Sequence, residues 1–170
     1  MPATRPVQAL PLAATVLTGT VALYMALVAF GNITDFGTNQ AFVQHVLAMD
    51  TTFKDPDLMW RAVESPTLQN IAYVLIIAWE TLAALVLIAA TVLWARELRR
   101  GTGYAGARRL GTAGLLMVLL LFGAGFLAIG GEWFAMWQSK TWNGLEAATR
   151  NVVLAGLALV VVQLRGADER

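Results

Sequence analysis

The sequence contains no cysteine and a single histidine, His45, among its 170 residues. Without cysteine the chain cannot form a disulfide bond, a thiolate metal site, an iron–sulfur cluster or a thioether link to haem. With one histidine, a single chain cannot supply the two imidazoles of a bis-histidine haem. His45 and Met49 could share a metal ion, but two ligands without an assured third are weak support for a site. We therefore predict no cofactor and no metal centre.

Charged side chains are scarce as well. Asp, Glu, Lys and Arg make up 14% of the residues and hydrophobic types 58%, whereas soluble domains carry about 25% and about 45–50%, respectively. The formal net charge of +1 gives no reason to expect a nucleic-acid partner. This composition predicts that the chain is surrounded by a lipid bilayer. Residues 1–170 are expected to form one membrane domain with no appended soluble domain.

Long apolar runs are what the sequence has in abundance. Each predicted crossing has at least the roughly 20 residues that an α-helix needs to span a bilayer. The fold expected is an all-α membrane protein, a four-transmembrane-helix bundle, with spans at about 9–30, 66–95, 110–130 and 145–164. The connections expected are outer loops at 31–65 and 131–144 and a cytoplasmic loop at 96–109.

The first and fourth spans differ from the other two. The first apolar run is longer than the 7–15 residues typical of a signal peptide, so we expect it to stay uncleaved. The fourth is the weakest, because its strongly apolar part covers only 152–164. A full crossing must therefore extend back past Arg150 and Glu146. The second span begins sharply, because Ser65 followed by Pro66 is a typical N-cap and first-turn pair.

The distribution of positive charge predicts the orientation. The basic residues on one side are Arg5, Arg96, Arg99, Arg100, Arg108, Arg109, Arg165 and Arg170. The opposite side holds most of the acidic residues and only Lys54, Arg61, Lys140 and Arg150 as basic ones. Because cytoplasmic loops of membrane proteins carry an excess of Lys and Arg, both termini are expected in the cytoplasm.

The outer loops carry signals of their own. Residues 41–49 place apolar side chains on one helical face, and Asp55-Pro56 predicts the start of a short helix reaching Val63. We therefore expect a short helical extracytoplasmic cap. Its candidate site for lipid, quinone or a protein partner comprises His45, Asp50, Glu132, Trp133, Trp137 and Trp142. The plainer interpretation is that the tryptophans anchor the chain at the membrane interface.

Three strings carry a family resemblance: residues 32–35 (NITD), 42–53 (FVQHVLAMDTTF) and 130–139 (GGEWFAMWQS). They resemble the bacterial family of predicted small integral membrane proteins known as domain of unknown function 2165, and the likeness covers roughly residues 24–164. The resemblance implies a four-span protein of the inner membrane. It implies no activity, and it transfers no catalytic residue.

Glu80 is the one acidic residue in the middle of an apolar run. An ionisable group there costs ~2.5–3.5 kcal/mol on insertion scales, so it needs a partner or a wet cavity. Glu80 and Arg150 lie at similar distances along the chain from the basic end of their spans, which predicts an ion pair between them. The polar network expected around this pair comprises Glu80, Arg150, Glu146, Asn151 and Tyr73. It serves either to fix the helix register or to handle an ion, a proton or a ligand.

No complete catalytic set is visible, so we do not expect an enzyme. The leading hypothesis is a non-enzymatic accessory or assembly protein of the bacterial inner membrane, in contact with lipid and with a membrane-protein partner or a second copy. The alternative is a small transporter or ion- or ligand-binding protein centred on Glu80 and Arg150. An enzyme acting on lipid or quinone would require Glu132 and His45 to converge with Glu64 or Asp50 near the tryptophans.

Overall fold

The part of the chain that the structure describes contains helices joined by turns and loops, and no strand. The structure is a computed structural model that describes residues 9–101 and 103–165. Its α-helices are α1 (Ala9–Thr34), α2 (Phe36–Ala48), α3 (Pro66–Arg100), α4 (Ala105–Leu119) and α5 (Leu145–Gln163). The 3₁₀ turns η1 (Met59–Arg61) and η3 (Met136–Gln138) and the π-helix η2 (Leu120–Trp133) complete the order. The predicted all-α class is confirmed.

The helices α4 and η2 follow one another without a break and are counted here as one. On this count, four helices are long and apolar enough to cross a membrane. They cover Ala9–Thr34, Pro66–Arg100, Ala105–Trp133 and Leu145–Gln163. The predicted number of spans is therefore confirmed. At ~1.5 Å per residue, α3 is about 52 Å long, well beyond a hydrocarbon core of about 30 Å. Part of α3 therefore lies outside the apolar layer.

The longest helix has well-defined ends. Ser65 Oγ accepts a hydrogen bond from the backbone N–H of Leu68 at 3.5 Å, and Pro66 occupies the first turn. At the other end Gly101 adopts a left-handed conformation with φ 73°, and its N–H donates to the carbonyl of Glu97 at 2.8 Å. Glycine adopts this conformation without the steric cost of a side chain. The start expected from Ser65-Pro66 is confirmed.

Small residues let the helices approach closely. Helix α1 packs along α3, α3 along α4, and α4 along α5. The buried face of α3 carries Ala83, Ala84 and Ala90, and a Cβ added to Gly114 of α4 would lie 2.7 Å from Leu87 Cδ2. Leucines such as Leu23 and Leu85 instead point outward and are exposed. This arrangement suits a bundle in lipid, where close packing rather than the hydrophobic effect associates the helices.

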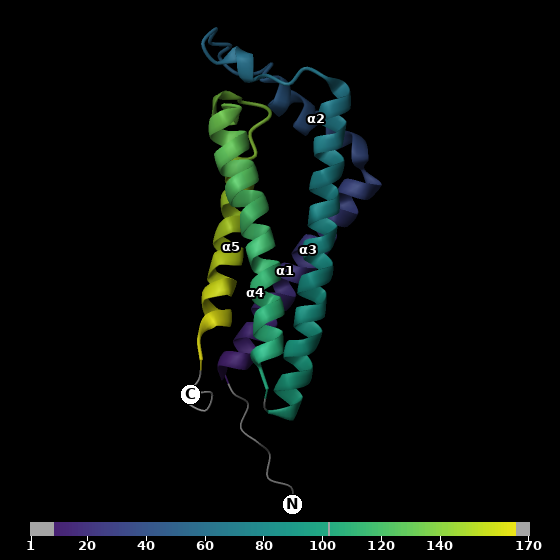
Figure 1. Cartoon of the computed structure of the whole chain (residues 1–170), viewed down its shortest axis with the longest axis vertical. Coiled ribbons are helices and arrows are strands. Elements are labelled where there is room, and N and C mark those ends of the chain that lie inside the picture. The colour runs from purple at the N-terminus through teal and green to yellow at the C-terminus, as the bar shows by residue number, and fades with distance from the viewer. Residues whose placement is uncertain (1–8, 102, 166–170) are drawn as a thin grey trace, which may run out of the picture.

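The helices diverge toward one end of the bundle. Helix α3 packs extensively against α4 but hardly at all against its continuation η2, while η2 stays beside α5. Figure 1 shows α2 turning back over the space between α3 and η2, at the top of the view. We call residues 36–65 and 134–144 the cap, and the end of the bundle that carries them the cap end.

The cap differs in part from the expectation. The helix expected at 41–49 begins earlier, at Phe36. The helix expected from Asp55-Pro56 to Val63 is instead a turn followed by the short 3₁₀ segment Met59–Arg61. Asp55 Oδ1 accepts from the N–H of Asp57 at 3.0 Å and so closes a turn. Val63 N–H donates to the carbonyl of Leu47 at 2.8 Å, which fastens this segment to α2 and draws it out of a helical path.

The second half of the third span is a π-helix, in which hydrogen bonds reach back five residues. At its end, the N–H of Phe134 donates to the carbonyl of Ile129 at 3.0 Å. Such segments are usually single turns inside α-helices and occur frequently at functional sites. This one is 14 residues long. It forms one wall of the cavities described next.

Candidate functional site

Glu80 is a buried carboxylate in the middle of α3. Its side chain is only 2% exposed, and its Oε2 accepts a hydrogen bond from Asn32 Nδ2 of α1 at 2.6 Å. Within residues 9–101 and 103–165, no basic side chain forms a salt bridge with Glu80, and no hydrogen bond reaches its second oxygen, Oε1. The amide therefore satisfies only part of the carboxylate.

A second asparagine holds Asn32 in place. Asn39 of α2 donates from Nδ2 to Asn32 Oδ1 at 2.6 Å, and the hydroxyl of Tyr73 donates to the backbone carbonyl of Asn32 at 3.3 Å. Because the carbonyl oxygen of the Asn32 amide is occupied by Asn39, its NH₂ group is directed at Glu80. The resulting chain of hydrogen bonds joins α2, α1 and α3.

A cavity of about 240 Å³ lies against Glu80. Its polar walls are Glu80, Asn32, Asn39 and Asn151, and its aromatic walls are Tyr24, Phe42, Tyr73, Phe122 and Phe126. These side chains come from α1, α2, α3, η2 and α5. The described residues that line it include no arginine, lysine or histidine. The cavity therefore combines one carboxylate with aromatic surface and no compensating positive charge.

Asn151 faces Glu80's cavity from α5. It is 6% exposed and lines the same space. Its side-chain amide has no hydrogen-bond partner among the residues that the structure describes. An amide sealed from water without a partner would cost roughly 1–3 kcal/mol. The Asn151 amide is not among the fully enclosed unpaired side-chain atoms, so a bound molecule or water in the cavity can supply its partner.

A second, apolar cavity of about 150 Å³ adjoins the first. The two share Phe42, Val43, Ile76 and Phe126 as walls. The rest of the second cavity is formed by apolar residues of α2, α3 and η2 and by Phe134 and Met136. It lies where α3 and η2 diverge beneath α2. The two cavities together provide a polar end and an apolar end.

The predicted ion pair between Glu80 and Arg150 is not formed. Arg150 Nη1 instead lies 3.9 Å from Glu146 Oε1, and both of these side chains point outward, 69% and 92% exposed. Equal depth along two helices does not fix the direction in which each side chain points. Successive residues of a helix point about 100° apart, so Asn151 faces inward where its neighbour Arg150 does not. Of the expected network, Glu80, Tyr73 and Asn151 line the cavity.

The residues proposed for the outer site form separate contacts. His45 Nδ1 lies 2.6 Å from Asp50 Oδ2, and the His45 ring stacks on Trp142 with centroids 4.6 Å apart. Trp137 packs edge-on against Phe53. These contacts fasten parts of the cap to one another, and none of the two cavities above and the depression beside Trp133 is lined by the whole group.

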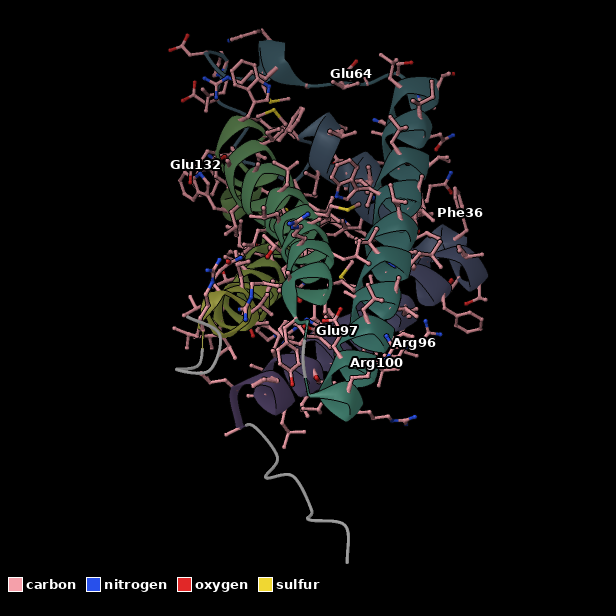
Figure 2. The ribbon with its side chains drawn as sticks, turned by 60° about the horizontal axis from the view of Figure 1, so that its bottom comes forward. Phe36, Glu64, Arg96, Glu97, Arg100 and Glu132 are labelled. Carbon is pink, nitrogen blue, oxygen red and sulfur yellow. The ribbon has the colours of Figure 1, made fainter. Side chains whose placement is uncertain are left out.

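Trp133 belongs to a third contact of the cap. The guanidinium of Arg61 lies 4.8 Å from the ring centroid of Trp133 and 5.6 Å from that of Trp60. Glu132 lines a shallow depression beside Trp133 and Arg61. Figure 2 shows Glu132 and Glu64 well separated at the cap end. In the described ranges, no group of three His, Asp or Glu residues could hold a metal ion. Of the residues that a lipid- or quinone-directed enzyme would bring together, His45 contacts Asp50, whereas Glu132 lies at the depression beside Trp133.

Sequence reasoning missed Asn32, Asn39 and Arg108. The two asparagines are spaced seven apart across the end of the first apolar run, a signal that polar side chains gather there, but their partner could not be read from spacing. Arg108, at the base of α4, donates from Nη1 to the carbonyl oxygens of Val162 and Leu164, the latter at 2.7 Å. It thus satisfies carbonyls at the end of α5 that the helix leaves open.

Comparison with known proteins identifies the family. No significant match is found among curated proteins or solved structures. A family model described as a predicted small integral membrane protein matches residues 10–165, nearly the whole chain. The recognition made from the strings around Asn32, His45 and Trp133 is confirmed. With its four apolar helices, the chain belongs to the family of predicted small integral membrane proteins, domain of unknown function 2165.

Proposed function

We propose that this integral membrane protein is a non-enzymatic binding protein for a small molecule, and that the molecule occupies the cavity beside Glu80. One observation carries the proposal. Two buried residues, Glu80 and Asn151, line the same cavity, and Glu80 Oε1 and the Asn151 amide have no hydrogen-bond partner among the described residues. This is the ligand-binding alternative of the sequence analysis, centred on Glu80, Asn32 and Asn151 in place of Glu80 and Arg150.

The arrangement resembles small-molecule sites in general. Such sites are concave and mostly apolar, with a few polar groups that orient the ligand, and they often lie between helices of a bundle. Here Asn39 and Asn32 orient Glu80, and the aromatic side chains supply the apolar surface. The position of an ionisable residue at membrane depth, facing a cavity, also favours a functional site.

The test is mass spectrometry of the protein released intact from lipid nanodiscs. We expect a co-purifying molecule on the wild-type protein and its loss from an Asn151→Leu variant, in which an apolar side chain of similar size replaces the free amide. In the empty state this variant should be more stable by about 1 kcal/mol, because it removes an unpaired buried group. A matched control is Arg150→Gln, on the outward face of the same helix, which should keep the molecule.

The proposal would be contradicted if the wild-type protein carries no molecule and Asn151→Leu does not increase its stability.

A second candidate function is that of an accessory or assembly subunit that binds a partner through the cap. It is supported by the exposed aromatic side chains Phe53, Trp60, Trp133 and Trp137. A Trp60→Ser, Trp137→Ser double variant should lose a partner that co-purifies in mild detergent. If the same variant instead changes only the depth of the protein in the bilayer, these residues are interface anchors.

The proposed location is the bacterial inner membrane, with both termini and the connection after α3 in the cytoplasm. Figure 2 shows Arg96 and Arg100 at the end of α3 that lies far from Glu64. The cap end instead carries Asp50, Asp55 and Asp57. This distribution of charge supports the proposed orientation.

A further inference from the structure

We infer that the molecule held in this cavity is an apolar organic cation, such as a protonated amine or a quaternary ammonium with a hydrocarbon substituent. The inference rests on the proposed function and names the chemical class of its ligand. It combines the carboxylate of Glu80, which has one hydrogen bond from Asn32 and no basic partner among the described residues, the aromatic walls around it, and the apolar cavity beyond.

The carboxyl group in the cavity wall favours a ligand with a positive charge. Glu80 is the one carboxyl group among the described residues of the cavity wall, and its polar neighbours Asn32, Asn39, Tyr73 and Asn151 are amides and a phenol. The basic residue nearest in sequence to the α5 wall, Arg150, faces outward with Glu146. An anionic ligand would therefore meet a carboxylate in a medium of low dielectric constant, where like charges repel strongly. A cation would supply the missing counter-charge.

The aromatic walls select an organic cation over a small metal ion. Tyr24, Phe42, Tyr73, Phe122 and Phe126 present ring surface to the same space as the carboxylate. Rings attract ammonium groups through their quadrupoles, and aromatic cages recognise quaternary ammonium ligands in this way. A divalent metal ion prefers several oxygen or nitrogen ligands, whereas among the described residues no three acidic or histidine side chains gather to provide them.

The adjoining cavity selects an apolar substituent. Its walls are hydrocarbon or aromatic, and it continues from Phe42, Val43, Ile76 and Phe126 toward the region where α3 and η2 separate. A chain attached to the ammonium group would bury there. Burying each CH₂ of this substituent is favourable relative to water. When the ligand enters the cavity from lipid instead of water, this gain disappears. The hydrocarbon substituent then determines the position of the ligand, and the carboxylate determines its affinity.

The experiment is isothermal titration calorimetry in lipid nanodiscs with octyltrimethylammonium and, as its neutral counterpart, 1-octanol. Empty nanodiscs correct for partitioning into lipid. We expect saturable binding of the cation by the wild-type protein and binding at least ~10-fold weaker by Glu80→Gln, a loss of about 1.4 kcal/mol. Octanol should bind both proteins with the same affinity. Glu80→Asp keeps the charge and should recover part of the preference for the cation.

A separate variant tests how much the aromatic rings contribute to binding of the cation. Phe126→Leu keeps the carboxylate and an apolar wall but removes a ring from both cavities. It should weaken the cation by several-fold and leave octanol unchanged, and its thermal unfolding checks that the fold is intact. Equal affinity for octanol and the cation, unaffected by Glu80→Gln, would overturn the cation assignment while leaving the binding function in place. Saturable binding of neither probe, together with no co-purifying molecule, would overturn both.

Discussion

At the residue scale, the decisive contact is the hydrogen bond from Asn32 to Glu80. A hydrogen bond to a charged group contributes about 1.5–3 kcal/mol, and here the 2.6 Å bond is the one that Glu80 receives from the described residues. Asn39 has no contact with the carboxylate and acts by orienting Asn32. Arg150, which its position in the sequence suggested as the partner, lies outside the cavity.

We therefore predict that Asn32→Ala lowers the free energy of unfolding by about 2 kcal/mol, because it leaves a buried carboxylate unpaired. Arg150→Gln should change it by less than about 0.5 kcal/mol, as for most exposed ion pairs. Equilibrium unfolding in mixed micelles gives both values. In a Glu80→Gln background the cost of Asn32→Ala should shrink, because the two residues are in direct contact. Additive costs, or coupling between Glu80 and Arg150, would contradict this account.

The sequence was enough to predict some residues of the site but not their hydrogen-bond partners. The depth of Glu80 follows from its position in an apolar run, and Tyr73 lies two turns earlier on the same face, so both were predictable. Asn151 was also in the expected network. The partner was not predictable, because it depends on the direction of side chains around each helix axis and on the return of α2 over the bundle. Neither of these is encoded in the spacing of residues along one helix.

At the scale of elements, the end of α5 depends on a side chain of α4. Arg108 donates to the carbonyl oxygens of Val162 and Leu164 and lies over the ring of Trp94, 5.6 Å from its centroid. We predict that Arg108→Gln lowers the unfolding free energy by about 2 kcal/mol, since it removes charge-assisted hydrogen bonds and packing together. The neighbouring Arg109 is the matched control. Among the residues that the structure describes it has no such contact, and Arg109→Gln should unfold at the wild-type temperature.

The contact between α3 and α4 depends on a glycine. A Cβ at Gly114 would lie 2.7 Å from the buried Leu87, whereas at Gly156 of α5 it would meet nothing within 4 Å. Gly114→Ala should therefore destabilise the bundle by about 1–3 kcal/mol through overpacking. Gly156→Ala should be neutral or stabilising by up to about 1 kcal/mol, because alanine favours the helix. Thermal unfolding of the two variants in one detergent provides the comparison. Equal stabilities would mean that Leu87 moves aside without cost.

The elements themselves were predictable to different degrees. Apolar runs and the Ser65-Pro66 pair located the spanning helices, because lipid exposure and helix caps leave direct signatures in sequence. The π-helical half of the third span was not foreseen. Its apolar composition satisfies an α-helix equally well, so the composition does not mark the change of hydrogen-bond register. The turn at Asp55 was mistaken for a helix start because aspartate closes turns and caps helices with the same side-chain oxygen.

At the scale of the whole molecule, the proposed orientation can be measured directly because the sequence has no native cysteine. Single cysteines introduced at Lys54, in the cap, and at Arg99, at the opposite end of α3, are both exposed. A membrane-impermeant maleimide should label Lys54→Cys in spheroplasts and should label Arg99→Cys only after the membrane is permeabilised. The reverse pattern would place the cap in the cytoplasm, against the distribution of Lys and Arg.

The chain of hydrogen bonds from Asn39 through Asn32 to Glu80 has a consequence for biosynthesis. Asn32 precedes Glu80 by 48 residues, so α1 and α2 are made before α3 leaves the ribosome. The amide that donates to this carboxylate is therefore already synthesised when α3 enters the membrane, where inserting an ionisable side chain costs ~2.5–3.5 kcal/mol. Phe122, Phe126 and Asn151, the far wall of the cavity, are synthesised later. The nascent chain thus contains Glu80 and its amide partner before it contains the residues that complete the cavity around them.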